Sequence, residues 1–247
     1  MSIKVLTLNL WNINEPLGPR YSALETGLKR LSPDIVCLQE VSCDPKSKRS
    51  QAELVATMCG HQNYVEEAGL AILSSKRLVH LTCVKLPRFR EDPPRHAMLA
   101  ELKIDGNPLL VINTHLSYPP QMITERTKQV NTLLAVLKHQ RLKNTARAKI
   151  LCGDFNDVAN SPAIRTILGS HEKFFDVFAT CHPGTKGFTY STRNPYVERS
   201  WTVDERIDYI FVNPHLISKK CAVVFDGHNG FDFASDHFGV FCSLEFR

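Results

Sequence analysis

The stretch Leu151-Cys152-Gly153-Asp154-Phe155-Asn156-Asp157 decides how this chain is organised, because a predicted strand ends there in polar side chains. The run 148–151 predicts a short buried strand, and Gly153 then permits a tight turn. Asp154 and Asn156 follow at the strand end, where α/β proteins often place their chemistry. Asp154 suits proton acceptance or metal binding, and Asn156 suits donation to a developing negative oxygen. A plain turn is the alternative, since Gly-Asp and Asn-Asp pairs are common turn formers.

The composition indicates an ordinary folded chain. The 247 residues are 43% hydrophobic, enough for one large core or two small ones, and 22% charged, which argues against disorder. No linker or low-complexity segment interrupts the sequence, so we expect a single domain over residues 1–247 that acts as a monomer. The net charge of +5 suits a phosphate-bearing substrate without requiring one, and it lies below that of dedicated DNA-coating proteins.

The 8 cysteines are expected to be reduced and not to bind zinc. Cys37, Cys152 and Cys242 lie in apolar runs, where free cysteine behaves as a small hydrophobe, and no CxxC pair occurs. The first residues lead directly into a predicted strand and do not resemble a signal peptide. No apolar run approaches the roughly 20 residues that span a bilayer. We therefore expect a cytoplasmic protein with no membrane span.

Other predicted strands also carry polar side chains at their ends. Three lead to polar residues: 3–10 to Asn9, 35–38 to Glu40, and 109–113 to His115. Two further predicted strands carry polar side chains at or before their first residues: Asp208 lies in the strand 206–212, and Asp236 and His237 lie just ahead of the last strand. A carboxylate at the tip of a buried strand needs a partner or a cation. The asparagine as a turn former and the histidine as a satisfied structural residue remain open alternatives.

The order of elements indicates a sheet-rich α/β sandwich. Helical spacing predicts helices over 21–31, 51–59, 124–138 and 161–168, and further strands are predicted over 69–73, 78–86, 98–104 and 218–225. Gly18 and Pro19 are assigned to a loop, and Ser161 to a helix N-cap. Strands outnumber helices and helices fall between strand groups, which favours a sandwich over a doubly wound sheet. The two halves are candidates for distant structural duplicates.

The polar residues at the strand ends share a chemistry. They comprise two amides, four carboxylates and two histidines. Glu40 with Asn9 makes an oxygen-rich site, which suits Mg²⁺ or Mn²⁺ better than zinc. A carboxylate beside a histidine fixes the imidazole tautomer for acid–base work. Together the groups fit metal-assisted hydrolysis of a phosphate ester.

Six short motifs occur in order from residue 9 to residue 237, nearly the whole chain. They are Leu8-Asn9-Leu10-Trp11-Asn12, Leu38-Gln39-Glu40-Val41, Asn113-Thr114-His115-Leu116, Gly153-Asp154-Phe155-Asn156, Arg206-Ile207-Asp208-Tyr209-Ile210 and Ser235-Asp236-His237. In this order they resemble the motifs of the endonuclease/exonuclease/phosphatase superfamily, which includes deoxyribonuclease-I-like nucleases. The set is specific for the superfamily and not for a substrate.

The resemblance implies a fold and a metal site. The implied fold is a four-layer α/β sandwich in which helices flank two central β-sheets. The implied cofactor is Mg²⁺, for which Mn²⁺ can substitute. By this resemblance Glu40 holds the metal with Asn9 beside it, and Asp236 supports the metal site.

The resemblance also implies catalytic roles for five residues. Asp154 orients or deprotonates the attacking water. Asn156 and His115 bind the phosphoryl oxygens. His237 stabilises the transition state or assists proton transfer, and Asp208 holds a histidine, expected to be His237, in position.

One position departs from part of the family. Members that act on abasic sites or on tyrosyl-DNA carry an aspartate two positions after the first asparagine, where this chain has Trp11. A carboxylate is therefore missing from the metal region, which disfavours those two identities. The Trp11-Asn12 pair looks more like the sphingomyelinase, deadenylase and bacterial-type branches. The segment after His115 lacks the long inserts of inositol phosphatases.

Substrate choice is expected to depend on the loops 88–96 and 187–199, because the strand-end residues recognise only phosphate and metal. The candidate substrate-binding residues are Arg95, His96, Tyr118, Tyr190 and Arg206. The leading hypothesis is a phosphodiesterase or nuclease that acts on nucleic acid or a nucleotide. The alternatives are a phosphatase or sphingomyelinase-like phospholipase C acting on a lipid or sugar phosphate, and, more remotely, an inactive binding module.

Overall fold

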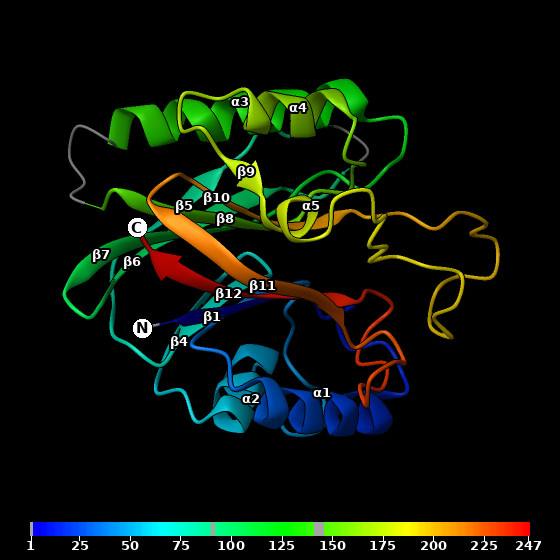
Figure 1. Cartoon of the computed structure of the whole chain (residues 1–247). Coiled ribbons are helices and arrows are strands. Elements are labelled where there is room, and N and C mark those ends of the chain that lie inside the picture. Colours follow the sequence, from blue (N-terminus) through cyan, green and yellow to red (C-terminus); the bar gives the residue numbers. More distant parts are fainter. Residues whose placement is uncertain (1, 90–91, 141–145) are drawn as a thin grey trace.

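The fold has four layers, and the structure, a computed structural model, describes residues 2–89, 92–140 and 146–247. Two β-sheets pack face to face, and helices cover both outer faces (Figure 1). The helices on the first sheet are α1 (Leu17–Leu31) and α2 (Gln51–Cys59), and those on the second are α3 (Ile123–Gln140) and α4 (Pro162–Leu168). The predicted α/β sandwich with two central sheets is confirmed.

The first sheet joins the two ends of the chain. Its strand order is β11-β12-β1-β2-β4-β3, and within it only β1 and β2 run parallel. The strands are β1 (Ile3–Asn9), β2 (Ile35–Gln39), β3 (Asn63–Glu67), β4 (Leu70–Ser74), β11 (Leu216–Val224) and β12 (Gly239–Phe246). The helix α1 connects β1 to β2, because parallel neighbours need a crossover.

The second sheet repeats this pattern of pairing. Its order is β5-β6-β7-β8-β10-β9, and within it only β7 and β8 run parallel, with α3 as their crossover. The strands are β5 (Leu78–Lys85), β6 (His96–Ile104), β7 (Asn107–His115), β8 (Ala148–Asp154), β9 (Phe175–Asp176) and β10 (Asp208–Val212). A short helix, α5 (Val177–Cys181), follows β9. The two sheets thus have the same order of parallel and antiparallel neighbours.

The central strands are apolar on both faces because both faces are covered. Cys37 of the first sheet and Ile150 of the second belong to the core between the sheets. Their chain neighbours Val36 and Leu151 point the other way, into the cores beneath the helices. A strand buried on both sides has no polar face, which explains the all-apolar runs in the sequence.

Most element boundaries agree with the prediction. The helix α2 matches it residue for residue, and Ser161 caps α4 by accepting a hydrogen bond from the backbone N–H of Ile164 at 3.3 Å. The prediction for Gly18 and Pro19 is wrong: both lie in the first turn of α1, where proline is tolerated because its missing N–H would have no helical partner. The sequence does not predict β3, whose residues are exposed or only half-buried.

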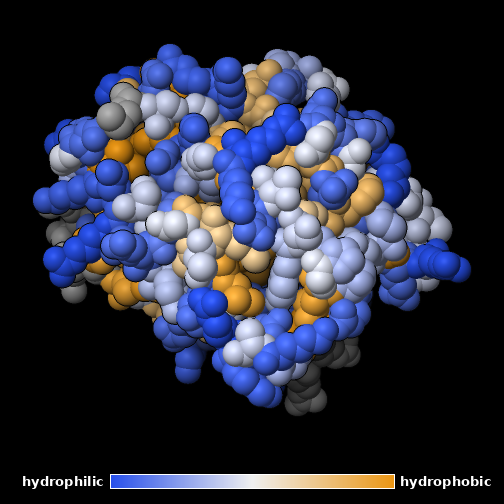
Figure 2. Space-filling model, turned by 90° about the horizontal axis from the view of Figure 1, so that it is seen from below, coloured by the Kyte–Doolittle hydropathy of each residue, from blue (hydrophilic) through white to orange (hydrophobic). Residues whose placement is uncertain are grey.

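Among the described residues, no helix is long and apolar enough to cross a bilayer. The face covered by α1 and α2 is mostly hydrophilic when seen from below, and polar side chains separate its apolar patches (Figure 2).

Candidate active site

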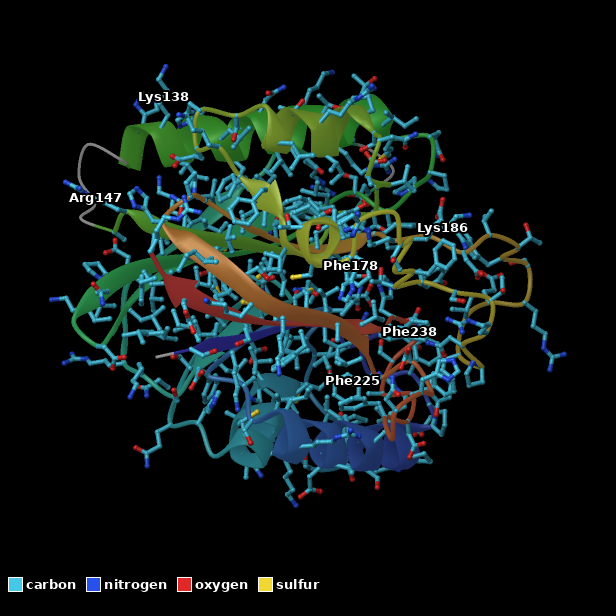
Figure 3. The ribbon with its side chains drawn as sticks, in the orientation of Figure 1. Lys138, Arg147, Phe178, Lys186, Phe225 and Phe238 are labelled. Atoms are coloured by element: carbon cyan, nitrogen blue, oxygen red, sulfur yellow. The ribbon has the colours of Figure 1, made fainter. Side chains whose placement is uncertain are left out.

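Polar residues of both sheets meet at the end of the sandwich opposite the chain termini (Figure 1). The parallel strands β1, β2, β7 and β8 end there. The strands β10 and β12 run antiparallel to their neighbours, so they begin at the same end. The residues brought together are Asn9, Glu40, His115, Asp154, Asp208, Asp236 and His237. Phe238, the residue after His237, marks this end in Figure 3.

Gly153 sets how closely β7 and β8 approach at the site. Its φ of 137° favours glycine, and a Cβ at this position would overlap the carbonyl oxygen of Thr114. The close approach makes Asp154 the register partner of His115 on one side and of Asp208 on the other. The glycine before Asp154 is therefore required by strand packing.

Asp154 is the hub of the site. Its Oδ2 accepts a 3.0 Å hydrogen bond from Nδ2 of Asn9 and lies 3.4 Å from Nε2 of His115 and 3.8 Å from Nε2 of His237. Its Oδ1 accepts a 2.8 Å bond from the backbone N–H of Asn156. Burial raises the pKa of Asp154, and the neighbouring histidines oppose that effect. A carboxylate of raised basicity, surrounded by donors, can accept a proton from water.

His237 is held by Asp208. Its Nδ1 donates a 2.9 Å hydrogen bond to Oδ2 of Asp208, which leaves Nε2 directed toward Asp154. Asp208 is fully buried, and its backbone N–H donates a 3.1 Å hydrogen bond to Oγ1 of Thr189. The carboxylate thus fixes the orientation of the imidazole.

The two histidines differ in charge at neutral pH. Burial lowers the pKa of His115 to about 4, so this ring is neutral. Burial also disfavours charge on His237, but Asp208, Asp154 and Asp236 outweigh it and raise the pKa of His237 well above its ordinary value. The environment of His237 therefore favours the charged imidazolium, whereas that of His115 favours the neutral ring.

Glu40 lies at the mouth of the site, bound by two amides. Its Oε1 accepts a 3.2 Å bond from Asn9, and its Oε2 accepts a 2.6 Å bond from Asn12. Glu40, Trp11 and Asn12 all have left-handed backbones, with φ of 53°, 55° and 49°. Such conformations are unfavourable and persist only where surrounding contacts impose them, which is common at functional sites.

The donor set fits a divalent cation. Asp154 and Asp208 offer carboxylate oxygens within 4.8 Å of each other and of a ring nitrogen of His237, and Asp208 Oδ1 is a buried oxygen with no hydrogen-bond partner among the described residues. Because a protonated imidazole cannot ligate a metal, the carboxylate oxygens are the ligands that this cluster offers while His237 is charged. The side-chain amide of Asn9 donates to both Glu40 and Asp154, so the predicted metal ligand Glu40 lies next to this cluster. Carboxylate oxygens in this number suit a hard cation such as Mg²⁺.

Asn156 and Asp236 are anchored beside the hub. The side-chain amide of Asn156 donates a 3.1 Å bond to the carbonyl of Leu116, and its backbone is left-handed with φ of 48°. Asp236 accepts a 3.1 Å bond from the Ser235 hydroxyl, and burial raises the pKa of Asp236 to about 6. Both residues therefore lie where the prediction places them, at the strand-end cluster.

A cavity of about 290 Å³ opens beside the strand-end cluster. Its lining includes Glu40 and His115 together with three predicted substrate-binding residues, Arg95, His96 and Tyr118. Arg95 makes two 2.8 Å hydrogen bonds to Asp92, so its charge is already paired. Arg90, another arginine of this loop, lies outside the described residues.

The other two predicted substrate-binding residues have different surroundings. The ring of Tyr190 packs against His237, with centroids 4.9 Å apart. Arg206 is buried, forms a 2.6 Å ion pair with Asp176 and lies 4.6 Å over the ring of Tyr209. These contacts make Arg206 part of the scaffold around β9 and β10, and it does not line the cavity.

Four residues near the site escape prediction from the sequence. Gln39 and Asn113 are buried polar side chains that meet between the sheets. Arg20 and Arg126 are buried arginines that bind backbone carbonyls of loops at the site. The first pair carries a signal, since an amide within an apolar run needs a partner. The arginines carry none, because their partners are carbonyls distant in sequence.

The fold and the site define a metal-dependent type of phosphoesterase. The model of the Endonuclease/Exonuclease/phosphatase family matches residues 6–237, and the chain belongs to this family. It is a phosphoesterase of that family with a candidate metal site.

Particular members are similar to the chain. Tyrosyl-DNA phosphodiesterase 2 of Xenopus laevis is 25% identical over 252 residues; the match covers 97% of this chain and 66% of that protein, slightly less than two thirds. TDP2 of D. rerio, solved as a complex with single strand DNA product, has a TM-score of 0.77 and 19% identity, with 99% of each chain covered. The human Nocturnin catalytic domain, solved with bound sulfate anion, has a TM-score of 0.78 and 18% identity, covering 100% of this chain and 95% of that one.

Trp11 stands where an aspartate is expected in members that act on tyrosyl-DNA, although tyrosyl-DNA phosphodiesterase 2 is among the similar proteins. The ring stacks on Tyr196 with centroids 5.7 Å apart, and the guanidinium of Arg20 lies 4.9 Å from its centre. Trp11 thus fills a packed position between two loops and adds no oxygen to the metal region.

Proposed function

We propose that the protein is a Mg²⁺-dependent phosphodiesterase that cleaves nucleic acid or a nucleotide. The observation that carries this proposal is Asp154, a buried carboxylate that lies between a neutral His115 and a cationic His237. Asp154 can accept a proton and the charged His237 can donate one. This combination suits displacement at phosphorus, where one oxygen attacks and another leaves.

The residues divide the work of hydrolysis. Asp154 orients the attacking water and accepts its proton. His237, kept in position by Asp208, gives a proton or a charged hydrogen bond to the developing negative charge. His115 and Asn156 bind phosphoryl oxygens. Glu40, with Asp154, would hold the divalent cation, which supplies Lewis-acid polarisation of the phosphate when bound.

The preference for nucleic acid rests on similarity and on aromatic surroundings. The similar D. rerio protein was solved with a DNA product. Around the site, Tyr118, Tyr190 and Tyr196 offer ring surfaces suited to stacking a base. A monomeric, cytoplasmic enzyme is part of the same proposal.

A substrate panel tests the proposal. Purified protein is assayed with single-stranded DNA, RNA, bis(4-nitrophenyl) phosphate, sphingomyelin and an inositol phosphate, each with Mg²⁺, Mn²⁺ or EDTA. We expect cleavage of a polynucleotide and the generic diester, loss of both in EDTA, and loss in Asp154→Asn. Full turnover in EDTA would contradict the metal requirement, and selective cleavage of sphingomyelin or the sugar phosphate would favour the alternative substrate class.

A further inference from the structure

Two buried arginines, Arg20 and Arg126, occupy matching places in the two halves of the fold. The helix α1 begins at Leu17 and α3 begins at Ile123, so each arginine is the fourth residue of its crossover helix. Arg20 is 1% exposed and Arg126 is 2% exposed. Removing a guanidinium from water is unfavourable unless its donors are satisfied, so the contacts of these residues indicate why they are buried.

Arg20 binds the loop that follows β1. Its two Nη atoms donate to the carbonyls of Leu10 and Asn14, and its guanidinium lies over the ring of Trp11. Its Nε donates a 3.1 Å hydrogen bond to the carbonyl of Ala234, in the segment that leads to the catalytic histidine. One side chain therefore joins the loop on the metal side to the segment of the proton donor.

Arg126 binds the loop that follows β7 in the same way. Its Nη1 donates to the carbonyls of Ser117 and Pro119 at 3.1 and 2.9 Å, and its Nη2 donates to that of Pro120 at 3.2 Å. Its Nε lies 3.1 Å from Oδ2 of Asp157, an ion pair that is not aligned as a hydrogen bond. This side chain joins the loop after His115 to the loop that carries Asn156.

We propose that Arg20 and Arg126 are a matched pair of positioning residues for the hydrolysis proposed above. Arg20 holds the Asn9 and Glu40 side of the site, and Arg126 holds the His115 and Asn156 side. A guanidinium carries five N–H donors in one fixed plane (the fork), so it can bind several carbonyls at once. A lysine ammonium cannot reproduce this arrangement. The loop after β1 contains the left-handed residues Trp11 and Asn12, and the loop after β8, which Arg126 reaches through Asp157, contains the left-handed Asn156; such conformations need surrounding contacts to persist.

The test compares four arginine variants with a control. Arg20→Lys and Arg126→Lys keep the charge and lose the fork, and Arg20→Gln and Arg126→Gln serve where a lysine variant does not fold. The control is Lys149→Met, which removes a buried cation paired with Glu172 at the opposite end of β8 from Asp154. The readouts are amide hydrogen exchange, Mn²⁺ affinity without substrate, kcat and KM on bis(4-nitrophenyl) phosphate, and urea unfolding.

The expected results separate the two sides of the site. An Arg20 variant speeds exchange in residues 10–14 and 234–236 and weakens Mn²⁺ binding by about 10-fold or more. An Arg126 variant speeds exchange at the amides of Ser117 and Tyr118, since Pro119 and Pro120 have no N–H, and lowers kcat by about 10-fold or more, while Mn²⁺ affinity stays within about 2-fold. Lys149→Met lowers stability without either selective change.

Two outcomes overturn the pairing. The first is that amide exchange in both loops of the arginine variants stays at the parent rate. The second is that metal affinity and turnover fall only in proportion to the loss of stability, as they would in Lys149→Met, which is what a purely structural role predicts. Failure of the proposed function is recognised separately: if the parent hydrolyses no phosphoester while each variant still loosens its own loop, the function falls and the positioning by Arg20 and Arg126 is supported.

Discussion

The Nε2 atom of Gln39 on β2 donates a 2.7 Å hydrogen bond to Oδ1 of Asn113 on β7, and this bond joins the two sheets beneath the active site. Asn113 in turn donates to the carbonyls of Leu38 and Ala71, at 2.8 and 2.9 Å, in the opposite sheet. Polar contacts of this kind fix one alignment of two faces that are otherwise apolar, because a shifted alignment would leave buried amides unpaired.

Replacing Gln39 should destabilise the fold. Gln39→Leu leaves the buried Asn113 oxygen without this donor, which typically costs about 1–3 kcal/mol. Urea unfolding of the parent and the variant measures the loss of stability. The control is Gln121→Leu, because Gln121 is exposed, whereas Gln129 is bonded to Ser117 in the loop at the site. An unchanged unfolding midpoint for Gln39→Leu would show that this bond does not stabilise the packing of the sheets.

Adding a methyl group at Gly153 should be far more damaging than at Gly18. At Gly153 the new Cβ would overlap the Thr114 carbonyl at a φ of 137°, whereas nothing lies within 4 Å of a Cβ at Gly18. Gly18→Ala is expected to be neutral or to stabilise by about 0.4–1 kcal/mol, and Gly153→Ala to destabilise by more than that. Thermal unfolding of both variants checks this, and equal stabilities would contradict the required close approach.

Asp208→Asn should lower turnover and move its pH dependence. The charge of Asp208 helps to raise the pKa of His237, so its removal lowers that pKa. The imidazolium is then lost at a lower pH, and the basic limb of the kcat profile shifts toward acid. We also expect kcat to fall on the order of a hundredfold or more, with KM less affected. A variant with the parent profile would mean that Asp208 does not act through His237.

His61 should make the fold less stable in mild acid. Its Nε2 contacts the Pro33 carbonyl at 2.9 Å, its Nδ1 has no partner among the described residues, and burial lowers the pKa of His61. The unfolded chain therefore binds this proton more readily, and the stability present above about pH 6.5 is lost as the pH falls below it. Urea midpoints at about pH 7.5 and about pH 5.5 should differ less in His61→Gln than in the parent or in the exposed control His139→Gln. An equal pH dependence in all three would exclude this origin.

Tyr118 tests the choice of substrate. Its side chain is 57% exposed and lines the cavity beside His115. If the substrate is a polynucleotide, Tyr118→Ala should weaken its binding by about 1–3 kcal/mol, the usual value of stacking one base, while turnover of the generic diester survives. Tyr64→Ala, at an exposed tyrosine on β3, is the control. Equal losses on both substrates would indicate that Tyr118 supports the site and does not select the base.

The strand-end residues could be predicted because their signal is local. An apolar run that gives way to a carboxylate, amide or histidine marks a strand end, and the α/β pairing pattern brings such ends together. The surroundings of the arginines could not be predicted in this way. Arg95 is paired with Asp92, and Arg206 with Asp176 behind β10. Composition alone cannot distinguish such paired guanidinium groups from free ones, since their partners are set by tertiary packing.

The bond from Asn9 to Asp154 has a mechanical consequence. Asn9 ends a strand of one sheet and Asp154 ends a strand of the other, so the 3.0 Å contact between them spans the interface of the sandwich. A slip of about 1 Å between the sheets would misplace the attacking groups, and a misplacement of that size can slow catalysis on the order of a hundredfold. The hydrolytic rate should therefore depend on how the two sheets are aligned. It should fall under mild pressure or low denaturant, at conditions where both sheets are still folded.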